Sequence, residues 1–265
     1  MRSPHPPILM YHGLTARTGL HPVSLAVERF RQQLALLRRL GYRSMSPVAI
    51  ADTLRSGAPF PSRTIAFTFD DGYLDTLTVA LPLLVEHGFT ATCYLVAGTV
   101  GRTSEWTEPA PLMGWDGVRE WLAAGMEIGA HSVTHPDLTR LTDRRLAEEV
   151  TGSRQQLEDR LGIPIASFAY PYNAHDERTG AAVAAAGYRA ACAGVHRSGA
   201  PLALFRADGA RDSWARFALQ LTPAYPVLRA VYRAAVPACT DHRSPVATSE
   251  AVGLLAGSRR GPPSS

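Results

Sequence analysis

Short apolar runs alternate along the chain with longer stretches in which apolar residues recur every three or four positions. The short runs are rich in β-branched and aromatic residues and predict buried strands, whereas the three-to-four spacing predicts helices. Strands are expected at 8–11, 65–70, 90–96, 126–130, 167–170 and 190–193, and helices at 25–40, 73–87, 116–124, 142–161 and 176–186. The regular succession of strand and helix is typical of an α/β fold with a parallel sheet.

A single domain accounts for this pattern. The chain has 265 residues, of which 46% are hydrophobic and 19% charged, and this is enough to bury one full core. Residues 1–7 contain no apolar segment of secretory length and are expected to be a flexible end. Residues 8–236 are expected to form the domain, and residues 237–265, rich in Ser, Pro, Gly and Arg, a disordered tail. No stretch reaches the length of a membrane span.

The charge pattern excludes one class of partner. All 27 basic residues are arginines, and they are not clustered with aromatic residues, which argues against nucleic-acid binding. The three cysteines, Cys93, Cys192 and Cys239, are odd in number and widely spaced, which predicts a reducing, cytoplasmic location rather than a disulfide framework. Residues 226–236 mix arginine with apolar residues, and this fits either a helix packed on the domain or a weak peripheral contact with a membrane.

Candidate chemistry gathers at one predicted strand end. Asp70 and Asp71 follow an apolar strand, and adjacent buried carboxylates repel each other unless a cation neutralises one or one stays protonated. His131 and His135 follow another strand and are four residues apart, a spacing that also arises by chance in loops. An aspartate with two histidines is a ligand set for a catalytic divalent ion with an open position for water. Zn²⁺ is expected, and Co²⁺, Ni²⁺ or Fe²⁺ would fit the same donors.

Three motifs carry a family resemblance. Residues 68–72 read T-F-D-D-G, residues 131–135 read H-S-V-T-H, and residues 168–172 form an aromatic segment that ends in Tyr-Pro-Tyr. Over about residues 8–221 the chain resembles the polysaccharide deacetylase family, the NodB-homology or carbohydrate esterase family 4 domain. The resemblance implies a distorted (β/α)7 barrel in a single domain and a metal-dependent N-deacetylase acting on an amino sugar.

The resemblance also implies roles for individual residues. The first aspartate of the family motif is the general base, which assigns Asp70. The second aspartate and both histidines bind the metal, which assigns Asp71, His131 and His135. The backbone N–H of the tyrosine after the proline, here Tyr172, would stabilise the oxyanion of the tetrahedral intermediate.

Two family features are missing from their usual places. The family arginine that orients the base precedes the Pro-Tyr pair, where this chain has an alanine and a tyrosine. Arg206 is a candidate replacement, the alternative being a surface salt bridge. The family's late L-x-x-H motif, which supplies the general acid, is also absent, but residues 9–12 read Leu-Met-Tyr-His. This order resembles the rearranged poly-N-acetylglucosamine deacetylases and nominates His12 as the acid, the alternative being a structural histidine at a strand end.

The substrate is defined less closely than the reaction. Trp106 lies in the long connection 97–114, where an aromatic ring would either stack on a sugar or pack on the barrel rim. Asn173 is expected at positive φ, the alternative being an amide contact with substrate. The expected substrate is an N-acetylated amino sugar met inside the cell, as a small glycoside, carrier-linked precursor or oligosaccharide. A metal-dependent amidohydrolase on a non-sugar amide or imide, or a non-catalytic carbohydrate-binding relative, remains an alternative.

Overall fold

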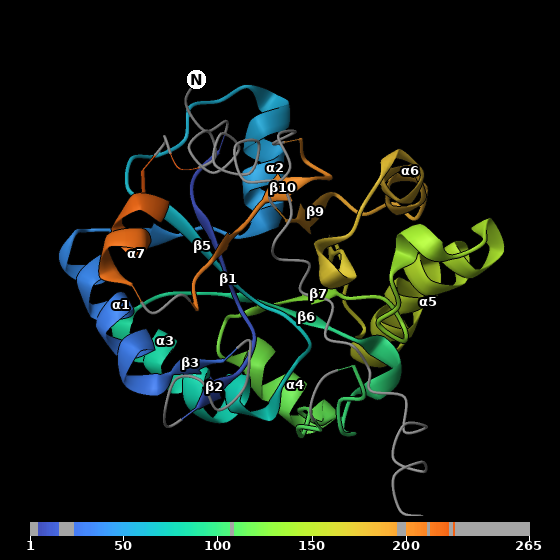
Figure 1. Ribbon diagram of the computed structural model, residues 1–265, viewed down its shortest axis with the longest axis horizontal. Coiled ribbons are helices and arrows are strands. Elements are labelled where there is room, and N and C mark those ends of the chain that lie inside the picture. The colour runs from blue at the N-terminus through green and yellow to red at the C-terminus, as the bar shows by residue number, and fades with distance from the viewer. Residues whose placement is uncertain are drawn as a thin grey trace, which may run out of the picture.

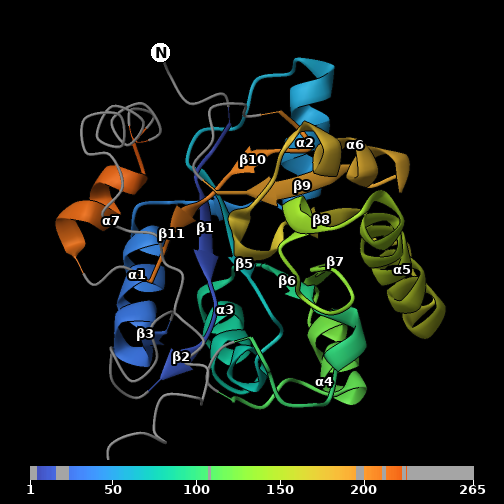
Figure 2. The same ribbon diagram turned by 45° about the vertical axis from the view of Figure 1, so that its right-hand side comes forward.

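The computed structural model describes residues 5–15, 24–106, 109–194, 200–210, 213–222 and 225. In these residues a curved parallel sheet lies at the centre and helices surround it (Figures 1 and 2). Six strands follow one another across the sheet: β1 (Ile8–Tyr11), β5 (Thr64–Phe69), β6 (Thr92–Leu95), β7 (Glu127–Ala130), β8 (Ser167–Ala169) and β9 (Ala190–Ala193). Each neighbouring pair is parallel, as the strand–helix alternation predicts.

Two short strands close this sheet into a barrel. β10 (Leu204–Phe205) pairs with β9 at one edge, and β11 (Ala207–Asp208) pairs with β1 at the other. Because only Arg206 separates them, one stretch of chain joins both edges and acts as a seventh strand. This confirms the predicted distorted (β/α)7 barrel. Smaller strands lie beside it: β4 (Arg43–Ser44) on β5, and β2 (Leu14–Thr15) paired with β3 (Leu25–Ala26).

The helices cover the outside of the barrel (Figure 2). They are α1 (Val27–Arg39), α2 (Pro47–Ser56), α3 (Leu81–His87), α4 (Trp115–Ala123), α5 (Asp143–Leu161), α6 (Glu177–Ala185) and α7 (Trp214–Gln220). A π-helical turn at Thr76–Ala80 precedes α3, so the helix expected at 73–87 is not one regular α-helix. α5 has both expected end signals: the Thr142 side chain accepts a hydrogen bond from the Arg145 N–H, and Gly162 takes the left-handed conformation after the last turn.

The core explains why the strand ends are held firmly. Every residue of β5 is buried, since the strand has the barrel interior on one face and helices on the other. Between the sheet and the surrounding helices, the ring centroid of Tyr11 lies 5.1 Å from that of Phe30 and 5.4 Å from that of Phe69. The ring centroids of Phe69 and Trp121 are 6.1 Å apart. These interlocked aromatic rings fix β1 and β5 relative to each other, and both strands end at the site described below.

The structure describes the chain ends only in part. His5, in the segment expected to be flexible, is buried, and its Nε2 accepts a hydrogen bond from the Phe205 N–H at 3.2 Å. This contact ties His5 to the closing strand, and the flexibility expected of residues 1–7 stays a prediction. Residues 226–236 and 237–265 lie outside the described residues, and the domain limits stay a prediction. Among the described helices, none is both long and apolar enough to cross a membrane.

Candidate metal centre

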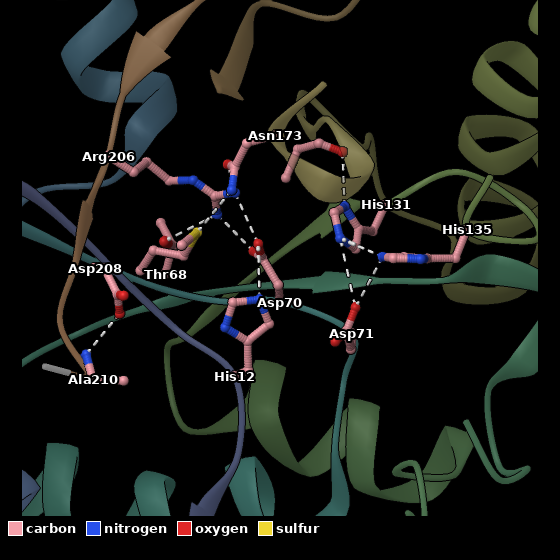
Figure 3. A network of polar contacts seen from close by, with 12 residues as sticks. His12, Thr68, Asp70, Asp71, His131, His135, Asn173, Arg206, Asp208 and Ala210 are labelled. Atoms are coloured by element: carbon pink, nitrogen blue, oxygen red, sulfur yellow. Dashed lines mark hydrogen bonds and ion pairs between the residues drawn. The ribbon is translucent and has the colours of Figure 1, made fainter. Parts of the chain in front are cut away.

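The side chains singled out from the sequence meet at the carboxyl ends of the barrel strands (Figure 3). His12 follows β1, Asp70 and Asp71 follow β5, and His131 follows β7. In parallel barrels this end is where the chain turns away and side chains are free to converge. The fold therefore brings together residues that lie more than a hundred positions apart.

The backbone at this end is unusual for non-glycine residues. Asp71, Ser132 and His135 all have positive φ, at 73°, 64° and 61°. Each such residue costs about 1–3 kcal/mol and persists only where its surroundings enforce it. Ser132 contributes to this enforcement, because its Oγ accepts a hydrogen bond from the His135 N–H at 2.9 Å. The turns therefore hold their side chains in a conformation that the isolated segments would avoid.

Asp71, His131 and His135 form a compact donor set. Asp71 Oδ1 lies 3.3 Å from His135 Nε2 and 3.6 Å from His131 Nε2, and the two Nε2 atoms are 3.2 Å apart. All three side chains are buried. Asp71 Oδ1 has no hydrogen-bond partner among the described residues, although the Nε2 atoms of both histidines lie within 3.6 Å of it. An unsatisfied buried carboxylate oxygen beside two nitrogen donors fits a divalent cation.

The protonation states agree with this interpretation. His131 Nδ1 donates to the Ala169 carbonyl at 2.7 Å, which leaves the Nε2 lone pair pointing into the donor set. Burial lowers the pKa of His131 to about 4, so the imidazole is neutral at pH 7. Burial alone would raise the pKa of Asp71, but the contacts with His135 and the nearby His12 and His131 hold it well below its ordinary value. His131 and Asp71 are therefore in the forms that bind a metal.

Asp70 is held by a buried arginine. Arg206 Nη1 and Nη2 donate to the two carboxylate oxygens of Asp70 at 2.6 and 2.8 Å, and Nη1 also approaches Thr68 Oγ1 at 3.3 Å (Figure 3). The Arg206 side chain has no solvent exposure, which rules out the alternative of a surface salt bridge. Burial acts to raise the pKa of Asp70, but the guanidinium outweighs it and the pKa is lowered. Asp70 is thus ionised and able to accept a proton.

Asn173 extends this arrangement in a way the sequence reasoning missed. Its φ of 54° confirms the expected left-handed backbone, and Tyr172 before it has a φ of 56°. The Asn173 side chain is engaged by the protein, because its Oδ1 accepts a hydrogen bond from Arg206 Nη2 at 3.1 Å. The lone asparagine directly after the Tyr-Pro-Tyr segment was the available signal, but its partner is 33 residues away.

His12 lies on the other side of Asp70. Its Nε2 is 3.9 Å from Asp70 Oδ2, and its side chain is 19% exposed, so it faces both the base and the solvent (Figure 3). The turn that follows is anchored, because the Leu14 N–H donates to Asp75 Oδ2 at 2.8 Å. The barrel thus brings the amino-terminal L-x-x-H histidine to the same mouth as Asp70. Its role as the acid stays a prediction.

Two aromatic rings pack on His135. Trp106 stacks on it with ring centroids 4.6 Å apart, and Tyr172 meets it edge to face at 4.6 Å. Trp106, in the connection 97–114, therefore packs against the candidate donor set rather than standing free. Tyr172 is 57% exposed, so its ring lies at the open side of the site.

The sequence is similar to known polysaccharide deacetylases. A family profile described as polysaccharide deacetylase matches residues 57–191, about half of the chain. A putative polysaccharide deacetylase, YxkH of Bacillus subtilis, is 25% identical over 183 residues, which are 69% of this chain and 62% of that protein. The poly-beta-1,6-N-acetyl-D-glucosamine N-deacetylase of Escherichia coli K12 is 37% identical over 62 residues, 23% of this chain and 9% of that protein. The chain thus spans less than two thirds of the length of either relative.

Solved structures share the fold. The deacetylase PplD of Streptococcus pyogenes, in complex with acetate, superposes with a TM-score of 0.73 at 24% identity, over 83% of this chain and 99% of that one. IcaB from Ammonifex degensii superposes with a TM-score of 0.71 at 25% identity, over 84% and 97%. The profile match includes the Asp-Asp-Gly strand end, the paired histidines and the Tyr-Pro-Tyr segment. The chain belongs to the polysaccharide deacetylase family.

Proposed function

We propose that this protein is a metal-dependent hydrolase that removes the N-acetyl group from an amino sugar, with Zn²⁺ as its resident ion. The observation that carries the proposal is the buried Asp71–His131–His135 donor set directly beside an ionised Asp70. Two carboxylates on adjacent residues have different partners: imidazoles for one and a guanidinium for the other. That separation suits one metal ligand and one proton acceptor.

Each group has a distinct part in amide hydrolysis. A divalent ion bound by the three ligands supplies a Lewis acid and lowers the pKa of a water molecule. Asp70, kept ionised and oriented by the Arg206 fork, accepts the proton of the attacking water. His12, within 3.9 Å of Asp70 and partly exposed, donates a proton to the leaving nitrogen. The Tyr172 backbone N–H donates to the oxyanion as it develops.

The substrate class rests on the surroundings and on the relatives. The exposed Tyr172 ring beside His135 offers an apolar face of the kind on which sugar rings pack. The Escherichia coli relative is a deacetylase of poly-beta-1,6-N-acetyl-D-glucosamine. We therefore place an N-acetylated amino sugar in the site, as a glycoside, carrier-linked precursor or oligosaccharide. A cytoplasmic location stays a prediction that rests on the unpaired cysteines, of which Cys93 and Cys192 are buried free thiols.

Acetate release tests the proposal. Purified Zn²⁺-loaded protein is incubated with β-1,6- and β-1,4-linked N-acetylglucosamine oligomers, and in parallel with simple acetamides and cyclic imides. Release of acetate from the sugars only, abolished in Asp70→Asn, is expected. Imide hydrolysis opens the ring and releases no acetate, so it is followed by substrate consumption; turnover of imides without turnover of sugars would establish the amidohydrolase alternative. No turnover of any substrate by a protein with a full complement of metal would favour a binding protein.

A further inference from the structure

A third buried acid, beyond Asp70 and Asp71, stands behind the turn that carries the two histidines. Glu149 lies on α5, and its carboxyl group is 2% exposed. Its Oε2 accepts hydrogen bonds from the backbone N–H groups of Val133 at 2.8 Å and Thr134 at 2.9 Å. Its Oε1 accepts from the Thr134 hydroxyl at 2.6 Å. Three donors of the segment between the two ligand histidines thus converge on one side chain.

These contacts provide acceptors for the backbone N–H groups of the turn between the two histidines. The two residues in left-handed conformation, Ser132 and His135, enclose the two residues whose amides Glu149 binds. On the other side, the Ser132 carbonyl accepts from the Ala97 N–H at 3.0 Å, and the Val133 carbonyl accepts from the Gly98 N–H at 2.9 Å. The turn is therefore clamped between the β6 exit and α5, and Glu149 provides the clamp for its N–H groups.

The geometry of the turn sets the geometry of the ligands. His131 and His135 reach the same point from either end of the turn, with their Nε2 atoms 3.2 Å apart. His131 is also fixed by its Nδ1 bond to the Ala169 carbonyl. His135 Nδ1 has no hydrogen-bond partner among the described residues, so the position of this ring depends on the backbone of the turn and on ring packing. A looser backbone would move His135 more than His131.

We propose that Glu149 is a positioning residue for the metal centre: by binding the amides of Val133 and Thr134 it holds His135 in place to ligate the ion. The inference rests on the proposed metal site and adds to it a residue 14 positions beyond the last ligand. Hydrogen-bond partners outside the ligand shell commonly change metal affinity by about 10–100-fold when removed. Glu149 would act in this way through the backbone rather than through an imidazole nitrogen.

The test measures Zn²⁺ affinity of the full chain by competition with a chromophoric chelator, for the wild type and three variants. Glu149→Ala is expected to bind Zn²⁺ about 10–100-fold more weakly. Glu149→Gln should recover most of the affinity, since its amide oxygen still accepts from both backbone N–H groups and its NH₂ donates to the Thr134 hydroxyl. Glu148→Ala is the control on α5, because Glu148 is the exposed neighbour of Glu149 and shares only Arg145 with it: Arg145 pairs with Glu148 and lies 3.6 Å from Glu149 Oε1. This control should stay within twofold of the wild type.

The outcomes separate a positioning role from a merely structural one. If Glu149→Ala lowers the melting temperature of the metal-free protein but keeps wild-type Zn²⁺ affinity, the inference is overturned while the metal site stands. If the wild type itself binds no Zn²⁺, the metal site falls, and the inference with it. Should Glu149→Ala not fold, Thr134→Val removes one of the three contacts. That variant is expected to weaken binding about threefold to tenfold, and unchanged affinity would likewise refute the inference.

Discussion

The contact between Asp70 and Arg206 makes a quantitative prediction. Arg206→Ala would leave Asp70, which is 2% exposed, as a buried charge without its bidentate partner. Breaking a buried ion pair from one side costs about 3–5 kcal/mol, mostly because the remaining charge is uncompensated. Asp70→Asn in the same background removes that charge. The double variant Asp70→Asn/Arg206→Ala should therefore be less destabilised than the two single variants added together, by about 2–4 kcal/mol.

The destabilisation caused by Arg206→Ala should depend on pH. The Arg206 guanidinium lowers the pKa of Asp70 against the effect of burial, so in the wild type the pair adds stability above the unfolded pKa near 4. That stability is lost as the pH falls through the folded pKa. Without Arg206, burial dominates and the pKa of Asp70 rises above its ordinary value. The cost of Arg206→Ala should therefore be larger at pH 7 than at pH 4, where the carboxyl group takes up a proton.

Urea unfolding of the four proteins, with chelator present to remove metal linkage, measures the coupling directly. The free energies of unfolding at pH 7 should give a coupling well above the 0.5 kcal/mol scatter of independent sites. Additive single-variant effects at pH 7, or a cost of Arg206→Ala that does not change between pH 7 and pH 4, would refute the reasoning.

Two further predictions concern the amino-terminal turn. His12→Ala should keep the fold and metal content but lose about 100-fold or more in acetate release, as expected for removal of a general acid; unchanged kinetics would assign the acid elsewhere. Burial raises the pKa of Asp75 to about 6, so the folded state favours the protonated carboxyl group. The stability that this protonated group contributes is fully present below the unfolded pKa near 4 and is lost as the pH rises through 6. Asp75→Asn keeps an acceptor for the Leu14 N–H and should be more stable than the wild type by about 1–3 kcal/mol at pH 8, with little difference at pH 4. Urea unfolding at both pH values checks this, and a difference independent of pH would contradict it.

Local patterns predicted the elements that have strong local signals. The apolar run at residues 8–11 matches β1 at both ends, and the helix expected at 142–161 starts one residue later, at Asp143. The start of α1 is displaced from 25 to 27 because Leu25–Ala26 pairs with β2 instead. The closing strands β10 and β11 are two residues each, too short for any periodicity to reveal. Their existence depends on pairing across the barrel, which is a property of the tertiary fold.

The site residues likewise include some that short motifs predict and others that only the tertiary fold brings together. The family motifs predicted the donor set, since Asp71, His131 and His135 belong to short segments with fixed spacing. Arg206 was a candidate from the sequence, but its bidentate contact with Asp70 depends on closure of the barrel, because the two residues are 136 positions apart. Glu149 gave no signal at all in the sequence, where it is one of many helical glutamates. What identifies it is the set of amides that it meets after folding.

Metal stoichiometry distinguishes the roles of the two adjacent aspartates. Wild-type protein, Asp71→Ala and Asp70→Asn are loaded with Zn²⁺, desalted, and analysed for metal per chain. The account predicts about one ion in the wild type and in Asp70→Asn, because Asp70 is a proton acceptor held by Arg206 and not a ligand. It predicts almost none in Asp71→Ala, which lacks the carboxylate of the donor set. Full occupancy in Asp71→Ala, or loss of the ion in Asp70→Asn, would contradict the assignment of the two adjacent aspartates.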